Sequence, residues 1–452
     1  MLLSVISIVS GLFALLVFRR YRKQQLLVPL PGPPPTSYLT GHFKDMFGLH
    51  GLEFQGKVLE TYGPTVRMTG VMGLPIFTNV AKQACEAIDK ALLTEVIDVF
   101  PWTTAAALEL IGEAGLGYSF NSFSGERNEY SVAIRSVAQL LTKLVPFIPI
   151  YPYLVRLPVT PSLLSCALFP LLRQVLRSRS LQNEQAEQIL RTRQDMLASG
   201  ADLESVTGRG KDILTQLMRA NEEGLDRDAM IGHMNILIFA GHETTSSAMA
   251  RILEILSNNQ EIQEKLRNEV LQCREEDVLE LPYLDAVVKE TLRLYPPASY
   301  LGRVCEEDTV VPLDYPISTP YGVVASLPIK RGTRLALSVI FSNRDEKIWG
   351  NRAGEFWPER WLQSEQPGNS SLQSMNSSIM TFGIGKYACI GLNFAVMEIK
   401  AMTAQLLKSF KFETSGEEYA WEVQGVQNPY LTKERGNPTR VPKLPLRVSR
   451  FQ

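Results

Sequence analysis

The spacing of apolar residues along the chain predicts a protein built mainly of helices. Apolar side chains recur every three to four residues over several stretches, which is the pattern of a helix with one buried face. The stretches are Leu181–Met196, Asp228–Leu256, Gln260–Arg274, Tyr283–Leu294 and Asn393–Phe410, with a further helix expected at Ala105–Gly115. Extended segments are few and are expected near Pro64–Met68, near Leu74–Asn79 and between Thr309 and Ser338. The predicted fold class is therefore mainly α with minor β.

The N-terminal pattern predicts a membrane anchor. Residues 2–18 carry no charged side chain, and a basic cluster follows directly at Arg19, Arg20, Arg22 and Lys23. A helix of this length just reaches across a hydrocarbon core of about 30 Å. A cleaved signal peptide is the alternative, but its basic residues precede the apolar run instead of following it. The basic flank is expected on the cytosolic side of the membrane.

Three parts are expected along the chain. They are a transmembrane anchor at residues 1–18, a basic flank and proline-rich hinge at residues 19–40, and one large domain at residues 41–452. Within this domain, residues 140–176 form a second apolar stretch that prolines interrupt. This stretch is either buried core or a surface that dips into the bilayer. Residues 364–378 predict a polar loop.

Composition narrows the function classes. With 46 basic and 47 acidic residues, the chain has no overall positive field to attract nucleic acid. The cysteines are Cys85, Cys166, Cys273, Cys305 and Cys389, and none of them forms a CxxC pair. An odd and sparse set argues against a disulfide framework and for a reducing compartment. Only Cys389 has an unusual neighbourhood.

The segment around Cys389 has the composition of a ligand-binding loop. Its residues of interest are Phe382, Gly383, Gly385, Lys386, Cys389 and Gly391. Glycines let the backbone approach a flat ligand closely. The cysteine stands just ahead of a predicted helix, whose positive end favours the thiolate. Backbone N–H groups of the turn can also donate to the sulfur and tune a bound metal.

Two other interpretations of this loop are possible from its sequence. Gly383, Gly385 and Ala388 fit the spacing of a dinucleotide-binding fingerprint, but that motif needs a βαβ unit. A long helix follows here and the chain soon ends, so the fingerprint is rejected. A structural glycine loop with an incidental cysteine remains the alternative.

Polar residues interrupt the strongly apolar helix predicted at Asp228–Leu256. The sequence Ala-Gly-His-Glu-Thr-Thr occupies residues 240–245, and buried polar groups need partners. A zinc-protease motif is excluded because its second histidine would fall at Ser246. The pattern favours a locally opened helix in which Thr244 faces a cavity and Glu243 relays protons. A capped or solvated polar patch is the alternative.

Two further segments complete the pattern. Glu290 and Arg293 lie three residues apart on one predicted helix face. Arg360 belongs to an aromatic-rich turn at residues 356–361 that cannot be helical through Pro358. Taken in order, the four segments resemble the cytochrome P450 family from about residue 60 to the end. The anchor and hinge resemble those of microsomal, particularly fungal, members.

The resemblance implies a fold, a cofactor and the residues of the site. The fold would be the cytochrome P450 fold behind an N-terminal transmembrane helix, and the cofactor haem b with Cys389 as the axial thiolate ligand of the iron. Phe382, Gly383, Gly385, Lys386 and Gly391 would form the haem loop, and Arg303 would contact a propionate. Glu243 and Thr244 would be the catalytic pair that activates oxygen. Glu290, Arg293 and Arg360 would support the haem face.

The resemblance also implies an activity and partners. The protein is expected to be a monooxygenase that inserts one oxygen atom of dioxygen into an apolar organic substrate. Its electrons would come from NADPH through a separate NADPH–cytochrome P450 reductase. The expected location is the endoplasmic reticulum membrane, single-pass, with the catalytic domain cytosolic. A P450-fold isomerase or dehydratase is one alternative.

The sequence departs from the family in two places. The position two residues before the cysteine, usually basic, is Tyr387, with Lys386 beside it. The family also carries a haem-covering helix with the pattern Trp/His-x-x-x-Arg, and no such pattern occurs from Arg67 to Arg135. A segment of several tens of residues is therefore expected to be lacking between about residues 79 and 105. A truncated, non-catalytic remnant with impaired haem binding is the second alternative.

Overall fold

The computed structural model describes residues 74–92, 94–124, 130–134, 170–199, 213–214, 218, 226–319, 322–362, 379–437 and 440–451. Several predicted features lie outside these residues: the anchor and hinge, the extended segment at Pro64–Met68, most of the apolar stretch and the polar loop at 364–378. Among the described residues, no helix is both long enough and apolar enough to cross a membrane.

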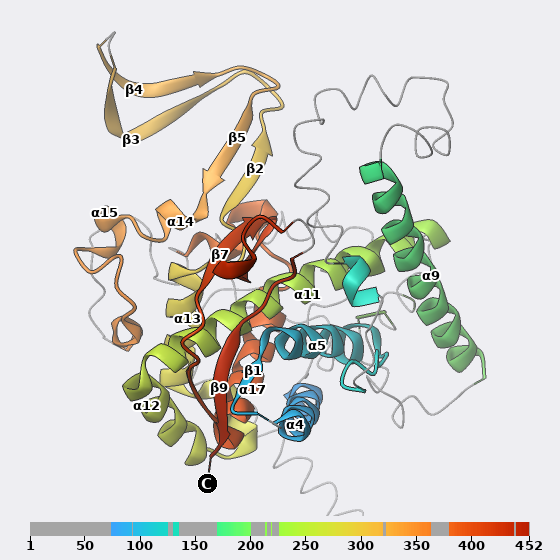
Figure 1. Cartoon of the computed structure of the whole chain (residues 1–452). Helices are drawn as coiled ribbons and strands as arrows, with labels where there is room; N and C mark the ends of the chain where they lie inside the picture. Colours follow the sequence, from blue (N-terminus) through green and yellow to red (C-terminus); the bar gives the residue numbers. More distant parts are fainter. Residues whose placement is uncertain are drawn as a thin grey trace, which may run out of the picture. The chain divides into compact units, whose positions relative to one another are not determined.

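Helices make up most of the described structure, as the apolar spacing predicts (Figure 1). In chain order the helical elements are α4 (Leu74–Ala91), α5 (Phe100–Leu110), the π-helix η1 (Ile111–Leu116), α9 (Pro170–Ala198), α11 (Arg227–Asn258), α12 (Gln260–Leu271), η4 (Glu275–Glu280), α13 (Pro282–Leu294), α14 (Val339–Ser342), α15 (Glu346–Trp349), η5 (Pro358–Trp361), η6 (Met380–Phe382), η7 (Gly385–Tyr387), α17 (Leu392–Ser409) and η8 (Thr432–Glu434).

The described strands form small antiparallel sheets. The strands are β1 (Val96–Asp98), β2 (Tyr300–Val304), β3 (Thr309–Thr319), β4 (Gly322–Ile329), β5 (Arg334–Ser338), β6 (Phe410–Thr414), β7 (Tyr419–Gln424), β8 (Val426–Leu431) and β9 (Pro445–Arg450). The order of the three-stranded sheet is β1-β9-β6, and the pairs are β2-β5, β3-β4 and β7-β8. The extended region predicted between Thr309 and Ser338 is confirmed as β3, β4 and β5.

One predicted extended segment is wrong, because Leu74–Asn79 is the first part of helix α4. Buried side chains of this helix recur at helical spacing, at Phe77, Val80, Ala84 and Ile88. They face α17 and α5, and the ring of Phe77 meets that of Phe394 edge to face at 5.1 Å. Packing on both neighbours decides the conformation, and a six-residue apolar run is too short to distinguish strand from helix.

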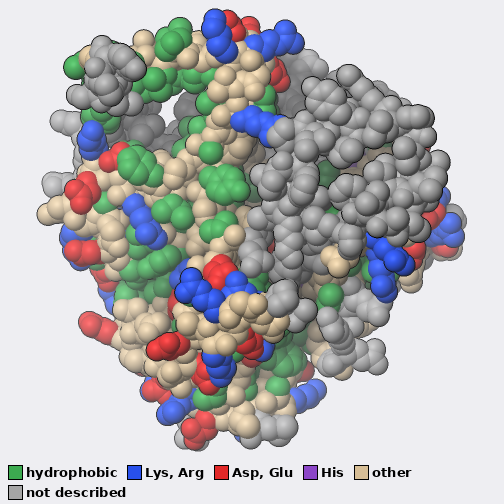
Figure 2. Space-filling model, turned by 45° about the horizontal axis from the view of Figure 1, so that its top comes forward, with side chains coloured by type: hydrophobic (Ala, Val, Ile, Leu, Met, Phe, Trp, Pro, Cys, Tyr) green, Lys and Arg blue, Asp and Glu red, His purple; other side chains and the backbone are tan. Residues whose placement is uncertain are grey.

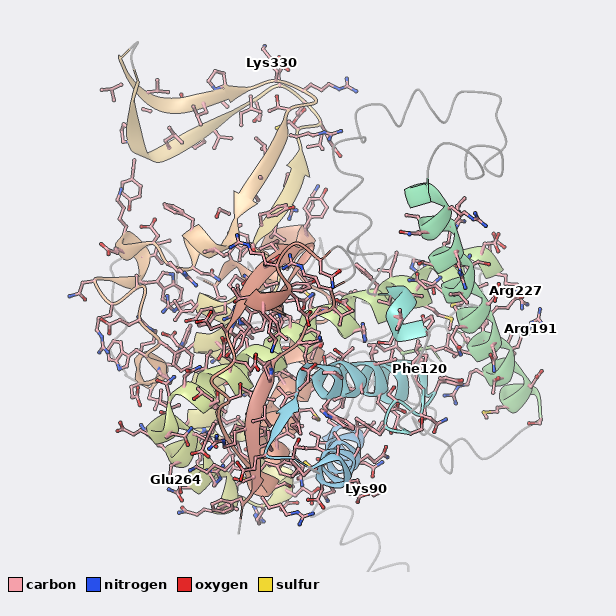
Figure 3. The ribbon with its side chains drawn as sticks, in the orientation of Figure 1. Lys90, Phe120, Arg191, Arg227, Glu264 and Lys330 are labelled. Carbon is pink, nitrogen blue, oxygen red and sulfur yellow. The ribbon has the colours of Figure 1, made fainter. Side chains whose placement is uncertain are left out.

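Helix α11 lies at the centre of the core. It contacts α5, α9, α17 and strand β6, and in Figure 1 it crosses the middle of the view. Its contact with α9 includes an ion-pair cluster: Arg191 and Arg227 both pair with Glu187, at 2.9 and 2.8 Å, and lie close together in Figure 3. Helix α11 thus contacts elements from distant parts of the chain.

The hairpin of β3 and β4 extends from this core and is exposed. Val310, Tyr315 and Val323 are large apolar side chains of the hairpin that lie at the surface. Figure 2 shows a face of the molecule on which hydrophobic side chains lie among Lys and Arg side chains. Strand β2 pairs with β5 beside this hairpin, and Arg303 of β2 lies beside Tyr387 of the predicted ligand loop.

Candidate active site

The loop before α17 is held in shape by its own backbone. The N–H of Cys389 donates to the carbonyl of Phe382 at 2.7 Å, which closes the loop across its base. Gly383 and Gly385 have φ angles of 67° and 70°, in the left-handed region that side chains other than glycine disfavour. The glycines predicted from the sequence are therefore required by the turn, and they fix where the cysteine lies.

Helix α17 begins directly after the cysteine. Its N-cap residue is Gly391, whose carbonyl accepts from Ala395 N–H at 2.8 Å. The N–H of Gly391 donates to the Cys389 sulfur and lowers the pKa of the thiol, but partial desolvation by the surrounding protein acts more strongly and raises it, although Cys389 lies at the surface. The sequence predicts only the effects of the helix end and of the loop amides on this pKa. Desolvation of the sulfur opposes both effects.

The surface around the loop combines apolar and positive groups. Ile384, Tyr387, Ile390 and Leu392 are exposed apolar side chains of this segment. The guanidinium of Arg303, on β2, lies 5.0 Å from the centre of the Tyr387 ring, and the ammonium of Lys386 lies 5.0 Å from the same ring. The structure thus brings together the two cations that the sequence singled out. An apolar surface beside two positive charges fits a flat apolar group that carries carboxylates.

Five side chains in the polar segment of α11 make hydrogen bonds, although the buried Nδ1 of His242 makes none. The pairs are His242 with Ser131, Thr244 with the carbonyl of Ala240, Thr245 with Glu398, Ser246 with Thr104, and Ser247 with the carbonyl of Gln427. This arrangement explains how so many polar side chains lie inside a core helix. Gly241 has a separate role, because a Cβ there would lie 3.2 Å from the side chain of Ile111 in η1. Glycine thus permits the close approach of η1 to α11.

The two residues of the predicted catalytic pair differ in their exposure to solvent. Glu243 is 3% exposed, whereas Thr244 is partly exposed. The Thr244 hydroxyl donates to the Ala240 carbonyl at 2.6 Å, and α11 is helical through this position. The locally opened helix that the sequence suggested is therefore not present. The threonine hydroxyl bonds back to its own helix instead, a contact that Ser and Thr side chains readily make.

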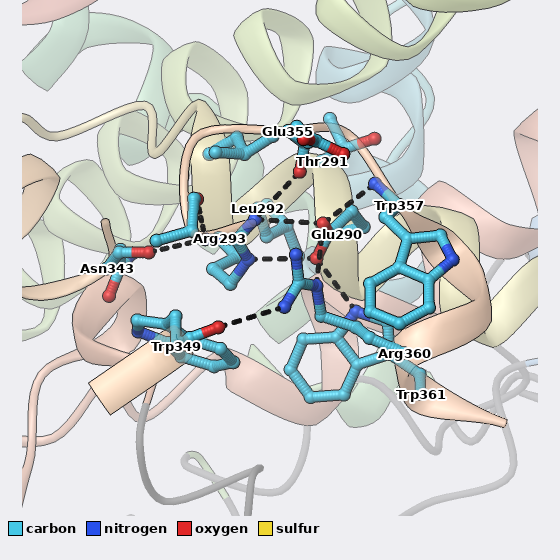
Figure 4. A network of polar contacts seen from close by, with 12 residues as sticks. Glu290, Thr291, Leu292, Arg293, Asn343, Trp349, Glu355, Trp357, Arg360 and Trp361 are labelled. Carbon is cyan, nitrogen blue, oxygen red and sulfur yellow. Dashed lines mark hydrogen bonds and ion pairs between the residues drawn. The ribbon is translucent and has the colours of Figure 1, made fainter. Parts of the chain in front are cut away.

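The three charged residues predicted to support the site form one buried network (Figure 4). Both carboxylate oxygens of Glu290 accept from Arg293, each at 2.8 Å, and Arg360 Nε donates to Glu290 at 3.0 Å. The backbone N–H of Trp357 and the indole of Trp361 complete the shell of Glu290, at 2.9 and 3.0 Å. The network ties α13 to the turn at residues 356–361.

Glu398 is a site residue that the sequence analysis missed. It lies on α17 and is fully buried, and its Oε1 accepts from the Thr245 hydroxyl at 2.6 Å. Burial raises the pKa of its carboxyl well above the ordinary value, and the Thr245 hydrogen bond only partly opposes this. The available signal was a lone acidic residue on the apolar face of the predicted helix Asn393–Phe410.

Comparison with known proteins agrees with this geometry. The family model described as cytochrome P450 matches residues 62–422. Cytochrome P450 monooxygenase 219 of Postia placenta is 32% identical over 512 residues, covering 93% of each chain, and cytochrome P450 monooxygenase 212 of the same fungus is 32% identical, covering 96% of each. The ganoderic acid synthetase of Ganoderma lucidum is 31% identical, covering 82% of this chain and 72% of its own. A crystal structure of a cytochrome P450 superposes with a TM-score of 0.59 at 20% identity, covering 84% of this chain and 74% of that one. The chain therefore belongs to the cytochrome P450 family.

Proposed function

We propose that this protein is a haem-thiolate monooxygenase in which Cys389 ligates the iron. The observation that carries the proposal is the loop closed by the 2.7 Å hydrogen bond from Cys389 N–H to the Phe382 carbonyl, with Gly391 N–H donating to the sulfur. This family of oxidoreductases holds haem through an axial cysteine thiolate. Such a cofactor, when bound, supplies the cleavage of dioxygen, with the thiolate donating electron density.

The residues around the loop would hold the haem. The glycines at 383 and 385 keep the backbone free of side chains that would stand between loop and ring. Apolar side chains of the same segment offer a dry surface. Lys386 and Arg303 would neutralise the propionates, because both cations lie beside Tyr387.

Two residues of α11 would handle protons. The Thr244 hydroxyl is anchored on the Ala240 carbonyl, which fixes its oxygen as an acceptor. Glu243, the preceding residue, is buried. Its carboxyl group is suited to hold and release a proton in a site with little water.

The remaining parts of the proposal rest on the sequence and on the family. Electrons would come from NADPH through NADPH–cytochrome P450 reductase, and the substrate would be an apolar organic molecule. Residues 2–18 would anchor the chain in the endoplasmic reticulum membrane, with the catalytic domain in the cytosol. A P450-fold isomerase or dehydratase would form its product without NADPH, so the dependence of product on NADPH separates the two reactions.

The ligand assignment is tested by the absorption spectrum of the reduced protein under carbon monoxide. Cys389→Ser is expected to abolish the thiolate-type band, because the serine hydroxyl is a far weaker ligand. Cys273→Ser is the matched control, since Cys273 is a partly exposed cysteine far from the loop in sequence, and it should leave the band unchanged. A thiolate-type band that survives in Cys389→Ser would overturn the assignment.

A second candidate, a remnant that binds haem poorly, is favoured by the lengths of the alignments. The alignment with monooxygenase 219 extends over 512 positions but covers 93% of 452 residues, about 420, so roughly 90 positions have no counterpart in this chain. The alignment with monooxygenase 212 extends over 533 positions and covers 96%, about 434 residues, which leaves roughly 100.

The sequence predicts that the lacking segment falls between about residues 79 and 105. A form of the chain with the corresponding segment of monooxygenase 212 restored should bind haem fully, whereas the 452-residue form should bind less than one haem per chain. Equal and full occupancy of the two forms would rule out the remnant.

A further inference from the structure

Asn343 lies directly after α14 and is fully buried. Its backbone carbonyl accepts from Arg293 Nη1 at 2.7 Å (Figure 4). Its side-chain oxygen accepts from the backbone N–H of Met380 at 2.7 Å, and its side-chain nitrogen donates to the hydroxyl of Thr381 at 2.8 Å. One buried residue therefore connects the charged network of α13 with the start of the cysteine loop (residues 380–391).

The hydroxyl of Thr381 joins two segments at once. It accepts from Asn343 and donates to the carbonyl of Leu292 in α13 at 2.6 Å. The backbone N–H of Met380 can only donate, so the oxygen of the Asn343 amide must face it and the amide nitrogen must face Thr381. The proton of the Thr381 hydroxyl is then left for the Leu292 carbonyl. A single orientation of the amide satisfies all three contacts, which defines the position of this segment.

The anchored segment leads directly to the residue that carries the sulfur. The residue after Thr381 is Phe382, whose carbonyl accepts from the N–H of Cys389 at 2.7 Å. In the part of the chain that the structure describes, the other backbone hydrogen bonds of residues 380–389 join the loop to itself or to the start of α17. The two hydrogen bonds of the Thr381 hydroxyl therefore tie the cysteine loop to α13 and to its charged network.

We propose that Thr381, held by Asn343, is a positioning residue for Cys389. The proposal rests on the proposed function, in which the Cys389 sulfur ligates the iron. With the hydroxyl in place, the Phe382 carbonyl stays at a fixed distance from α13, and its hydrogen bond with the Cys389 N–H fixes the residue that carries the sulfur. Without the hydroxyl, the buried amide nitrogen of Asn343 loses its acceptor, and the loop can move away from α13 while the rest of the core stays folded.

Hydrogen exchange of the loop, read by mass spectrometry on the full chain, tests the anchor without any turnover. Thr381→Val keeps the shape of the side chain and removes the hydroxyl, whereas Thr381→Ser keeps the hydroxyl. We expect the backbone amides of residues 382–389 to exchange at least about tenfold faster in Thr381→Val than in the unmodified chain, and less than about twofold faster in Thr381→Ser. The matched control is Thr291→Val, because the buried Thr291 hydroxyl donates at 2.8 Å to the Val287 carbonyl within α13. This control should leave the loop amides unchanged.

The spectrum of the reduced protein under carbon monoxide gives a second measurement. In Thr381→Val the thiolate-type band should be lost at a lower urea concentration than the helical circular dichroism, because the loop loosens ahead of the core. In the unmodified chain and in Thr291→Val the two signals should be lost together. Thr381→Ala, which cannot overfill the site, replaces Thr381→Val in both measurements if the valine form does not fold.

Loop amides that exchange at the same rate in Thr381→Val and in the unmodified chain would overturn the proposal. A uniform increase that includes strands β6 and β9 would also overturn it, because the hydroxyl would then support the whole fold instead of the loop. Failure of the proposed function is seen separately, as absence of the thiolate-type band in the unmodified protein, and the exchange rates then decide the anchoring of the loop by themselves.

Discussion

Replacing Glu290 should destabilise the protein more than any exposed ion pair does. Glu290, Arg293 and Arg360 are each at most 1% exposed, and Glu290 accepts five hydrogen bonds in the network. Removing the carboxylate leaves two buried guanidinium groups without their counter-charge, and breaking a buried pair in this way typically costs about 3–5 kcal/mol. Burial already lowers the pKa of Arg360, with Glu290 opposing, so the loss of Glu290 removes the main stabilisation of that charge.

The free energy of unfolding in urea measures this effect. Glu290→Gln preserves the volume of the side chain and removes the charge, so it should lose about 3 kcal/mol or more of stability. Tryptophan fluorescence is a suitable signal, because Trp357 and Trp361 contact Glu290 directly. The matched control is Glu417→Gln, since the Glu417–Lys433 pair at 2.7 Å is exposed and such pairs contribute about 0–1 kcal/mol. If Glu290→Gln lost no more stability than Glu417→Gln, the network would not be a stabilising centre and the reasoning would be wrong.

Three further outcomes are expected. Burial and the nearby Glu109 raise the pKa of Glu113 to about 7, so its folded form keeps a proton that the unfolded chain releases above pH 4.5. Stability is therefore lost as pH rises from about 4.5 through 7, and Glu113→Gln should gain up to about 3 kcal/mol over the parent across that window and no more above it, as melting temperatures from pH 4.5 to 8 will show. Gly112→Ala should lose about 1–3 kcal/mol in urea unfolding, because its Cβ would lie 2.6 Å from the Tyr118 carbonyl oxygen and 2.7 Å from the Phe120 ring; an unchanged midpoint would contradict this close packing. Thr244→Ala should keep its haem but form less product per NADPH consumed, and an unchanged ratio would argue against a proton-handling role for the hydroxyl.

The helices could be predicted from the local spacing of apolar residues. Features that depend on packing between distant parts of the chain could not. The predictions Asp228–Leu256 and Tyr283–Leu294 match α11 and α13 to within two residues, because a buried face repeats along one helix regardless of what covers it. The start of α4 was missed, because six residues do not reveal a period. The start of α5 at Phe100 was also placed five residues too late, and Pro101 lies in its first turn, where proline is favoured.

The candidate site shows the same difference between residues that sequence motifs predict and residues that only the packing brings together. The sequence motifs predicted that Glu290, Arg293 and Arg360 interact, and the three residues do meet in the structure. Such motifs reflect contacts between segments that lie far apart in the sequence. Glu398 and Ser131 belong to no such motif, and their partners stand over a hundred residues away, at Thr245 and His242. Only the folded core brings these groups together, so their roles become visible in the structure alone.

The position of β9 has a consequence for how the chain folds during synthesis. β9 is the middle strand of its sheet, and the N–H of Leu444, just before it, donates to Asp98 of β1, which stands 346 residues earlier. At synthesis rates of about 5–20 residues per second, β1 waits on the order of 20–70 s for its partner. During that time the backbone N–H and C=O groups of β1 have no partner strand from their own sheet. Unpaired strand edges can associate with other chains. The sheet therefore closes only after synthesis of the domain is nearly complete, and the yield of folded protein should respond to the rate of translation and to chaperones that shield strand edges.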